Sequence, residues 1–208
     1  MKKIIFALTL LVTIGAHAQS TKYVAAMQHN LELLDSAKTI EQLATVSQAF
    51  ERIGDAEKTQ WLPYYYAALA QTRIGFGDPK ADKDAIGQKA NDLAAKGEAI
   101  QKNAEFCTIR NMAATIQMLV NPMERFKTFG IKAYTYLQEG YKLDPNNPRL
   151  YFLDGASTFG KPEYIGGGKE KAKPLFVKAE QLFKAEKPAE LYPHWGLAET
   201  ERYLAKCN

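Results

Sequence analysis

Beyond residue 18, apolar side chains recur three and four positions apart almost without interruption. This spacing is the period of an amphipathic α-helix, whereas a half-buried strand alternates at every second residue. No run of alternating β-branched residues occurs in this part of the chain. We therefore expect an all-α protein in which each helix buries one face against its neighbours.

Breaker residues divide the helical pattern into about nine helices joined by short loops. A helical hairpin is expected over residues 22–53 and a closing helix over residues 190–206. The breakers between helices are Gly54-Asp55, Gly75-Phe76-Gly77-Asp78-Pro79, Asn121-Pro122 and Gly166-Gly167-Gly168.

An internal repeat is clearest after Asp144-Pro145-Asn146-Asn147. A first helix opens with Pro148 and carries an aromatic residue and then a small one. The next helix continues with a series of small, aromatic, small and apolar residues. These anchors are Tyr151, Gly155, Ala172, Phe176, Ala179 and Leu182, and fainter second-helix series start at Ala90 and Ala133. Small residues suit the points where two helices cross closely, and aromatic residues fill the gaps beside them.

This pattern resembles the tetratricopeptide repeat family. The resemblance implies a right-handed solenoid of helical hairpins with helical caps, spanning residues 19–208. The three repeats cover residues 57–103, 104–145 and 146–187. Their anchors stand farther apart than the family's period of about 34 residues, so we expect extra residues in the inter-helix loops. The alternative is a generic helical bundle whose anchors fall into register by chance.

The first eighteen positions, residues 1–18, have the three parts of a cleavable signal peptide. Lys2 and Lys3 precede an apolar run over residues 4–14, and Ala16-His17-Ala18 offers a cleavage site after Ala18. The run is shorter than the roughly 20 residues that a membrane-spanning helix needs. We expect a periplasmic or secreted protein of the bacterial envelope, with no membrane insertion after signal removal. The net charge of +4 includes Lys2 and Lys3, so little positive charge remains to indicate nucleic-acid binding.

Motifs for catalysis are incomplete. His29 and His194 have no partner at ligand spacing, and no His-Glu-x-x-His motif occurs. The triglycine at residues 166–168 precedes a lysine but lacks the Ser or Thr of a phosphate-binding loop, so we expect a turn there. We predict a protein that is not an enzyme and has no catalytic residues, metal or cofactor. Buried, neighbouring carboxylates at Glu105 or Asp154 with shifted pKa values would reopen the question.

In the tetratricopeptide family, the first helix of each repeat lines a concave groove. Carried over to this chain, the resemblance places Leu62 and Cys107 on that surface. The predicted partner-binding residues are Tyr66, Asn111, Arg149, Phe152, Phe159, His194 and Trp195. The last two would form its C-terminal wall, unless Trp195 only caps the preceding repeat. Residues 64–66 are all tyrosine and span about 300° of a helix, so at least one must face elsewhere.

Two functions remain open at this stage. The main prediction is a scaffold that binds a peptide segment or partner protein through amide, guanidinium and aromatic groups. The alternative is a carrier of hydrophobic small molecules with an internal aromatic pocket. We also expect Cys107 and Cys207 to be free thiols, because a whole repeat lies between them and bridged Cα atoms must be within about 7 Å. The sequence specifies neither the partner nor the oligomeric state.

Overall fold

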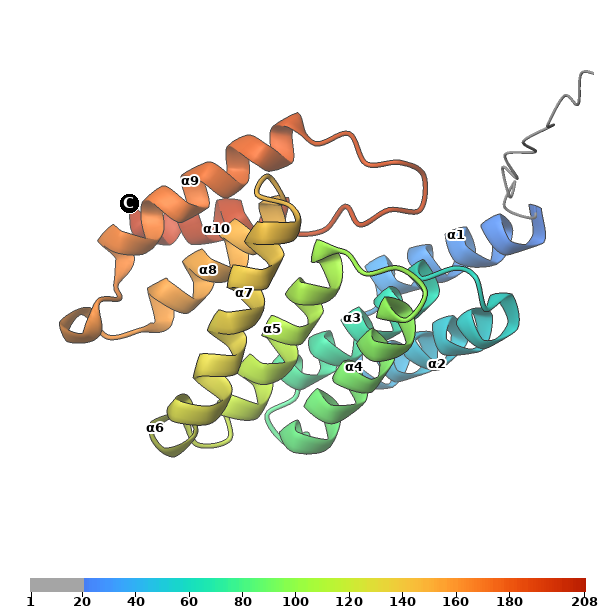
Figure 1. Cartoon of the computed structure of the whole chain (residues 1–208), viewed down its shortest axis with the longest axis horizontal. Helices are drawn as coiled ribbons and strands as arrows, with labels where there is room; N and C mark the ends of the chain where they lie inside the picture. Colours follow the sequence, from blue (N-terminus) through green and yellow to red (C-terminus); the bar gives the residue numbers. More distant parts are fainter. Residues whose placement is uncertain (1–20) are drawn as a thin grey trace, which may run out of the picture.

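The computed structural model describes residues 21–208, and in this range the chain is all-α, with helices and loops but no strand (Figure 1). The expected signal peptide, residues 1–18, lies outside the described residues. A π-helical turn, η1, joins α6 to α7 without a break, and η2 is a 3-10 turn. The elements are α1 (Thr21–Ser36), α2 (Ile40–Glu57), α3 (Leu62–Gly77), α4 (Lys83–Glu98), α5 (Ala104–Met118), α6 (Pro122–Arg125), η1 (Phe126–Gly130), α7 (Ile131–Leu143), α8 (Pro148–Gly160), η2 (Glu163–Ile165), α9 (Lys169–Ala185) and α10 (Leu197–Cys207).

Five of the helices, α2, α4, α5, α6 and α8, begin at a side chain that caps the free backbone N–H groups of the first turn. Thr39 forms a capping box with Gln42 at the start of α2. Asp82, Asn103 and Asn147 each accept a backbone N–H at the starts of α4, α5 and α8. These capping residues explain why the breaker pattern of the sequence predicts most boundaries well.

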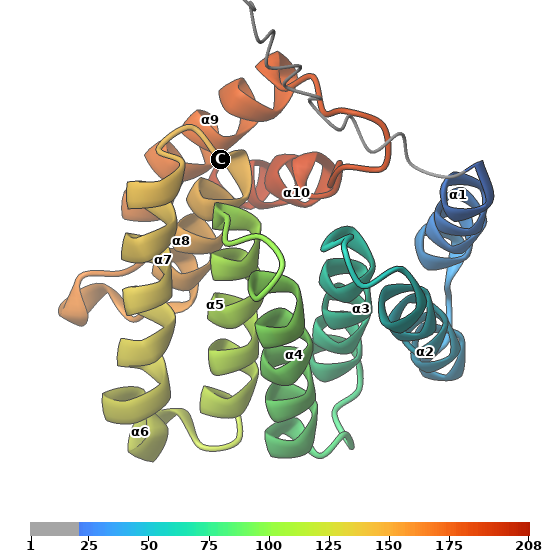
Figure 2. The same cartoon turned by 45° about the vertical axis from the view of Figure 1, so that its right-hand side comes forward.

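Each helix contacts the next one along the chain, and α3, α5 and α8 also contact one another in sequence. In Figure 2, α3, α4, α5 and α7 stand side by side, with α9 and α10 at one end and α1 and α2 at the other. Helices α3 and α5 are buried on nearly all sides, since both the outer helices and their inner neighbours cover them. The first helices of the three expected repeats thus form an inner layer.

Close crossings between helices occur at glycines of the repeat pattern. A Cβ atom on Gly97 of α4 would lie 2.2 Å from the ring of Phe106 in α5. One on Gly155 of α8 would lie 2.7 Å from the ring of Phe176 in α9. The alanines that anchor the second helices, Ala90, Ala133 and Ala172, are all buried. The sequence pattern therefore correctly identifies the faces on which helices meet.

Two predictions from the sequence are wrong: where the closing helix begins, and where the extra residues of the second repeat lie. The closing helix begins at Leu197 instead of residue 190, because Pro193 lacks an N–H and Gly196 adopts a φ of 115° that breaks the helix. Residues 186–196 form a long connection between α9 and α10, which we call the α9–α10 loop. In the second repeat, only residues 119–121 separate α5 from α6, so its extra length lies in the helix over residues 122–143. The triglycine does form the turn before α9, as expected.

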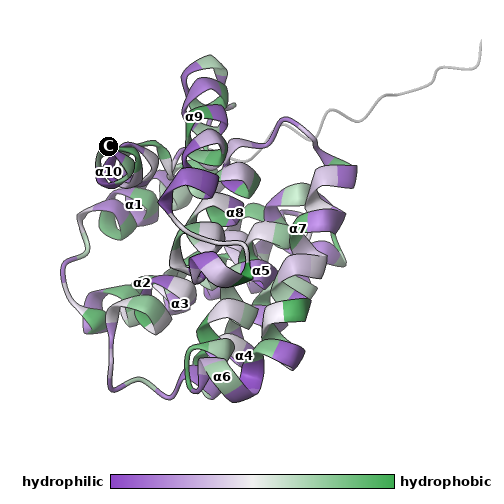
Figure 3. Cartoon of the chain, turned by 90° about the vertical axis from the view of Figure 1, so that its left-hand side faces the viewer, coloured by the Kyte–Doolittle hydropathy of each residue, from purple (hydrophilic) through white to green (hydrophobic). Residues whose placement is uncertain are grey.

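Hydrophobic and hydrophilic residues alternate around the helices (Figure 3), as expected of helices with one buried and one solvated face. Within residues 21–208, no helix is both long enough and apolar enough to cross a membrane.

Candidate functional site

A cavity of about 900 Å³ opens on the inner layer of helices, and we call it the groove. Its volume is within the range of about 300–1,000 Å³ typical of small-molecule sites. Helices α3, α5, α8 and α10 supply its walls, together with Trp195 at the end of the α9–α10 loop. The apolar lining residues include Leu69, Phe76, Met112, Leu119, Phe152, Leu153, Ala156, Trp195 and Tyr203.

Polar side chains in the groove wall are mostly bonded to the backbone. Thr72 donates its hydroxyl to the carbonyl of Leu69 at 2.8 Å, and Thr115 donates to that of Asn111 at 2.9 Å. The amide of Asn111 donates to the carbonyl of Ala133 at 2.9 Å. Since these donors are already used, the groove presents a predominantly apolar surface.

Two guanidinium groups also line the groove, one on α3 and one on α10. Arg73 donates to the carbonyl of Leu34 at 2.9 Å and lies 3.9 Å from the carboxylate of Asp35. Arg202 bonds Glu199 at 3.1 Å, and its side chain is 70% exposed. Exposed ion pairs contribute little free energy, so a carboxylate on a bound molecule can replace their present partners.

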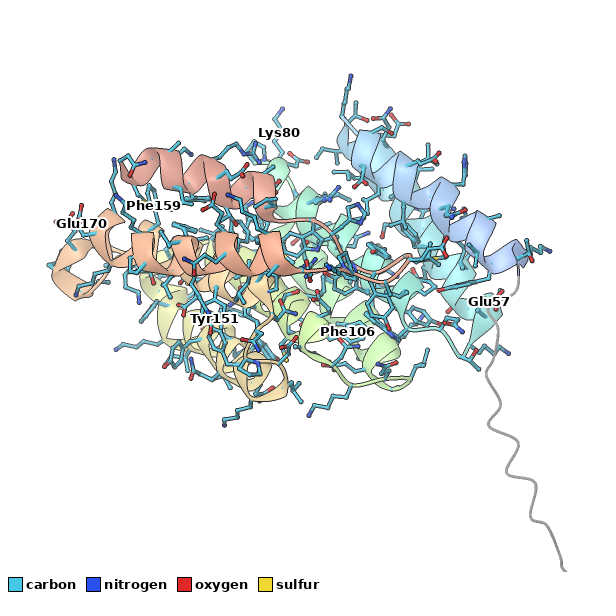
Figure 4. The ribbon with its side chains drawn as sticks, turned by 90° about the horizontal axis from the view of Figure 1, so that it is seen from above. Glu57, Lys80, Phe106, Tyr151, Phe159 and Glu170 are labelled. Carbon is cyan, nitrogen blue, oxygen red and sulfur yellow. The ribbon has the colours of Figure 1, made fainter. Side chains whose placement is uncertain are left out.

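An aromatic cluster forms the wall near α10. The ring of Phe152 meets the rings of Trp195 and Tyr203 edge-on, with centroids 6.3 Å and 6.0 Å apart. Tyr203 also stacks on Phe176 of α9 at 4.9 Å. Phe159 contacts both of these rings, and in the view from above it lies between α9 and α10 (Figure 4). Flat aromatic faces and edges of this kind bind planar apolar molecules well.

A buried chain of hydrogen bonds runs from the groove wall into the core. The indole Nε1–H of Trp195 donates to the hydroxyl of Tyr65 at 2.8 Å, and Tyr65 donates to Glu105 at 2.8 Å. The amide of Asn147 and the guanidinium of Arg149 both donate to the other carboxylate oxygen of Glu105, at 2.6 Å and 3.3 Å. Burial, together with the charge of Glu105, holds the pKa of Tyr65 well above its ordinary value, so the phenol stays protonated.

The predicted site residues divide into two groups. Asn111, Phe152 and Trp195 line the groove. Tyr66 does not, because it is buried and donates to the carbonyl of Leu191 at 2.7 Å. Arg149 does not either, since it is 1% exposed and bonds Glu105, Glu186 and the carbonyl of Pro193.

Of the remaining predicted positions, Phe159 supports Tyr203 from behind, and exposed His194 lies 3.1 Å from Asp35 on α1. Leu62 and Cys107 are buried in the core. Two of these corrections share a physical cause: the α9–α10 loop covers Tyr66 and Arg149, which donate to the carbonyls of Leu191 and Pro193. On α3 the lining begins at Leu69 and so covers only the C-terminal half, whereas on α8 it begins at Phe152.

Several groove residues were not predicted, among them Leu69, Met112, Leu153 and Tyr203. Leu69, Thr72 and Phe76 stand three and four positions apart, so the helical period could have revealed this stripe on α3. Tyr203 could not be found in this way, because its place depends on how α10 folds back on α9.

Other features outside the groove offer less. A second cavity of about 400 Å³ lies between α1 and α2. No group of three or more His, Cys, Asp or Glu side chains suited to a metal ion occurs within residues 21–208. Both cysteines are free and buried, in agreement with the sequence prediction. Glu105 and Asp154 have separate partners, since Asp154 accepts the hydroxyl of Tyr141 at 3.2 Å.

Comparison with solved structures gives an informative likeness. No family model matches the chain, and no curated protein matches it. Among solved structures, the chain is similar to the HusA haemophore from Porphyromonas gingivalis, with 33% sequence identity and a TM-score of 0.83. The match covers 91% of this chain and 94% of the HusA chain.

Proposed function

We propose that this chain, which belongs to the family of the HusA haemophore, is a carrier that holds a haem-like tetrapyrrole in the groove. The observation that carries the proposal is an apolar, aromatic-walled groove with a guanidinium on each of two of its helices. The similarity to a haemophore supports a haem-like molecule as the ligand of this groove.

The groove complements both parts of a tetrapyrrole. The apolar face of the macrocycle suits Leu69, Met112 and Leu153, and the ring edges suit the aromatic wall. Carboxylate side groups on the macrocycle can pair with Arg73 and Arg202 near solvent. Burial of the ring and pairing of the carboxylates together favour a planar, anionic, amphiphilic ligand.

The groove provides few ligands for iron. Its lining contains neither His nor Cys, and the side chains able to coordinate iron are Met112 and Tyr203. We therefore expect the macrocycle to supply most of the binding free energy through apolar contact.

The alternative function given by the sequence, a small-molecule carrier, is thus better supported than a peptide scaffold. The scaffold reading relies on Arg149 to pair with a carboxylate and on Asn111 to bond a peptide main chain. Arg149 is buried among its own partners, and the amide of Asn111 already donates to Ala133. A cavity of about 900 Å³ suits a compact ligand better than an extended peptide.

Two finer expectations belong to the same proposal. The helix pairs, with inner helices α3, α5 and α8, support a tetratricopeptide-like solenoid closed at one end by α9, α10 and their connecting loop. Export is supported by Lys2, Lys3 and the Ala16-His17-Ala18 cleavage pattern, and by the relation to a haemophore.

A haem titration of the chain, followed through the Soret absorbance band, tests the proposed function. Wild type should show a saturable spectral change, and Ala156→Trp should raise the dissociation constant by about tenfold or more, because it fills the groove. Ala95→Trp on the exposed surface of α4 is the matched control and should bind as wild type does. Absence of saturable binding, or equal binding by both variants, would contradict the proposal.

A further inference from the structure

The orientation of Trp195 in the groove wall is not fixed by secondary structure. The residue follows Pro193 in the α9–α10 loop and precedes Gly196, where α10 has not yet begun. A side chain on such a segment needs contacts from elsewhere to hold one rotamer. Its indole N–H donates to the hydroxyl of Tyr65 on α3 at 2.8 Å.

The direction of each hydrogen bond behind Trp195 follows from the chemistry of the groups. An ionised carboxylate only accepts hydrogen bonds, so the single proton of the Tyr65 hydroxyl is donated to Glu105. The lone pairs of the Tyr65 oxygen then remain as the acceptor for the indole N–H of Trp195. Arg149 and Asn147 both donate to the other carboxylate oxygen of Glu105. All of these bonds therefore point toward Glu105, which accepts from Tyr65 on the side of Trp195 and from Arg149 on the other side.

Burial makes this chain of bonds rigid. Tyr65 is fully buried and Arg149 is 1% exposed, so water competes poorly for their hydrogen bonds. The guanidinium of Arg149 also lies 5.8 Å from the centre of the Trp195 ring. Four separate segments (α3, α5, the start of α8 and the α9–α10 loop) thus meet behind one groove residue.

We propose that Tyr65 is a positioning residue for ligand binding, which acts through Trp195 by holding its indole in the orientation that the groove needs. The inference rests on the proposed function, since it deepens the role of the same groove. Tyr65 itself does not line the groove, and Trp195 is the lining residue to which its hydroxyl is bonded.

A double-mutant cycle on haem affinity tests this role with Tyr65→Phe, Trp195→Phe and the double variant. Tyr65→Phe removes only the hydroxyl, so haem affinity should fall about three- to tenfold, the range of one hydrogen bond. In the Trp195→Phe background the same change should alter affinity by less than about twofold. Tyr64→Phe is the matched control, because it removes a hydroxyl of the same helix that bonds Asp55 instead, and it should leave affinity unchanged.

A second measurement reads the position of the indole directly. The chain has two tryptophans, so a nitrogen-15 correlation spectrum contains two indole N–H signals to assign. In the ligand-free chain, hydrogen exchange of the Trp195 indole should quicken in Tyr65→Phe and stay unchanged in Tyr64→Phe.

Equal losses of affinity in both backgrounds, or unchanged indole exchange, would overturn the positioning role. Failure of wild type to bind haem would instead overturn the proposed function. In that case the exchange measurement alone would decide whether Tyr65 holds the indole.

Discussion

Replacement of Arg149 by alanine separates the sequence interpretation from the structural one. If Arg149 were a surface residue that binds a partner, its loss would leave stability nearly unchanged. In the structure its guanidinium is buried and bonds Glu105, Glu186 and the carbonyl of Pro193. Breaking one partner of a buried ion pair costs about 3–5 kcal/mol, because the other charge is left uncompensated.

The magnitude for Arg149→Ala lies near the lower end of that range. The side chain of Glu186 is 25% exposed and can turn to water, while Glu105 is 12% exposed and keeps its bonds from Asn147 and Tyr65. We expect a loss of about 3 kcal/mol in the free energy of unfolding, or about 6–12 °C in the melting temperature of a chain of this size.

Urea denaturation followed by far-ultraviolet circular dichroism measures this loss. Lys184→Ala, which removes an exposed ion pair with Glu180, is the control and should leave the free energy of unfolding nearly unchanged. Adding Glu105→Gln to Arg149→Ala removes the unpaired buried charge, so it should recover part of the stability. A loss of less than about 1 kcal/mol in the free energy of unfolding for Arg149→Ala would contradict a buried, ion-paired role for Arg149. The absence of any recovery with Glu105→Gln would contradict it as well.

Three further predictions follow from burial and from the groove lining. Burial raises the pKa of Asp154 despite its bond from Tyr141, so the ionised carboxylate costs stability above its unfolded pKa of about 3.9. Asp154→Asn should therefore raise the free energy of unfolding at pH 7 by about 1.4 kcal/mol per unit of the pKa rise. A stability advantage of this variant that persists below pH 4 would contradict the prediction. Burial raises the pKa of the Cys107 thiol to about 11, so iodoacetamide should label it only after denaturation. The denatured, unreduced chain should then take up labels at both Cys107 and Cys207, and no uptake would indicate a disulfide. Metal-free protoporphyrin should bind within about tenfold of haem in competition titrations, whereas a loss beyond about a hundredfold would indicate that iron coordination dominates.

Local features of the sequence predict the helices well. Capping residues such as Thr39, Asp82 and Asn147 act within a few positions of themselves, so their effect can be read without the rest of the chain. The alanine and glycine anchors likewise mark the faces that meet, because close helix crossings require small residues. The fold class and most helix boundaries follow from these short-range effects.

Long-range contacts account for what the sequence does not predict. The sequence pattern places Arg149 on the groove surface. Its burial depends on the carbonyl of Pro193, 44 positions away. Tyr66 is covered by Leu191, 125 positions away. No local pattern indicates that residues 186–196 fold over the inner helices, so the groove was predicted on the correct helices but partly at the wrong ends.

The proposal that the groove holds a haem-like tetrapyrrole is best tested by mapping where such a ligand binds on the chain. Gallium protoporphyrin is a diamagnetic analogue of haem, so its binding can be followed in nitrogen-15 and methyl correlation spectra of the chain. If the tetrapyrrole binds in the groove, the largest shift changes should occur at groove residues such as Leu69, Met112, Leu153 and the Trp195 indole. Shift changes centred on the cavity between α1 and α2, or the absence of saturable changes, would show that the groove is not the binding site.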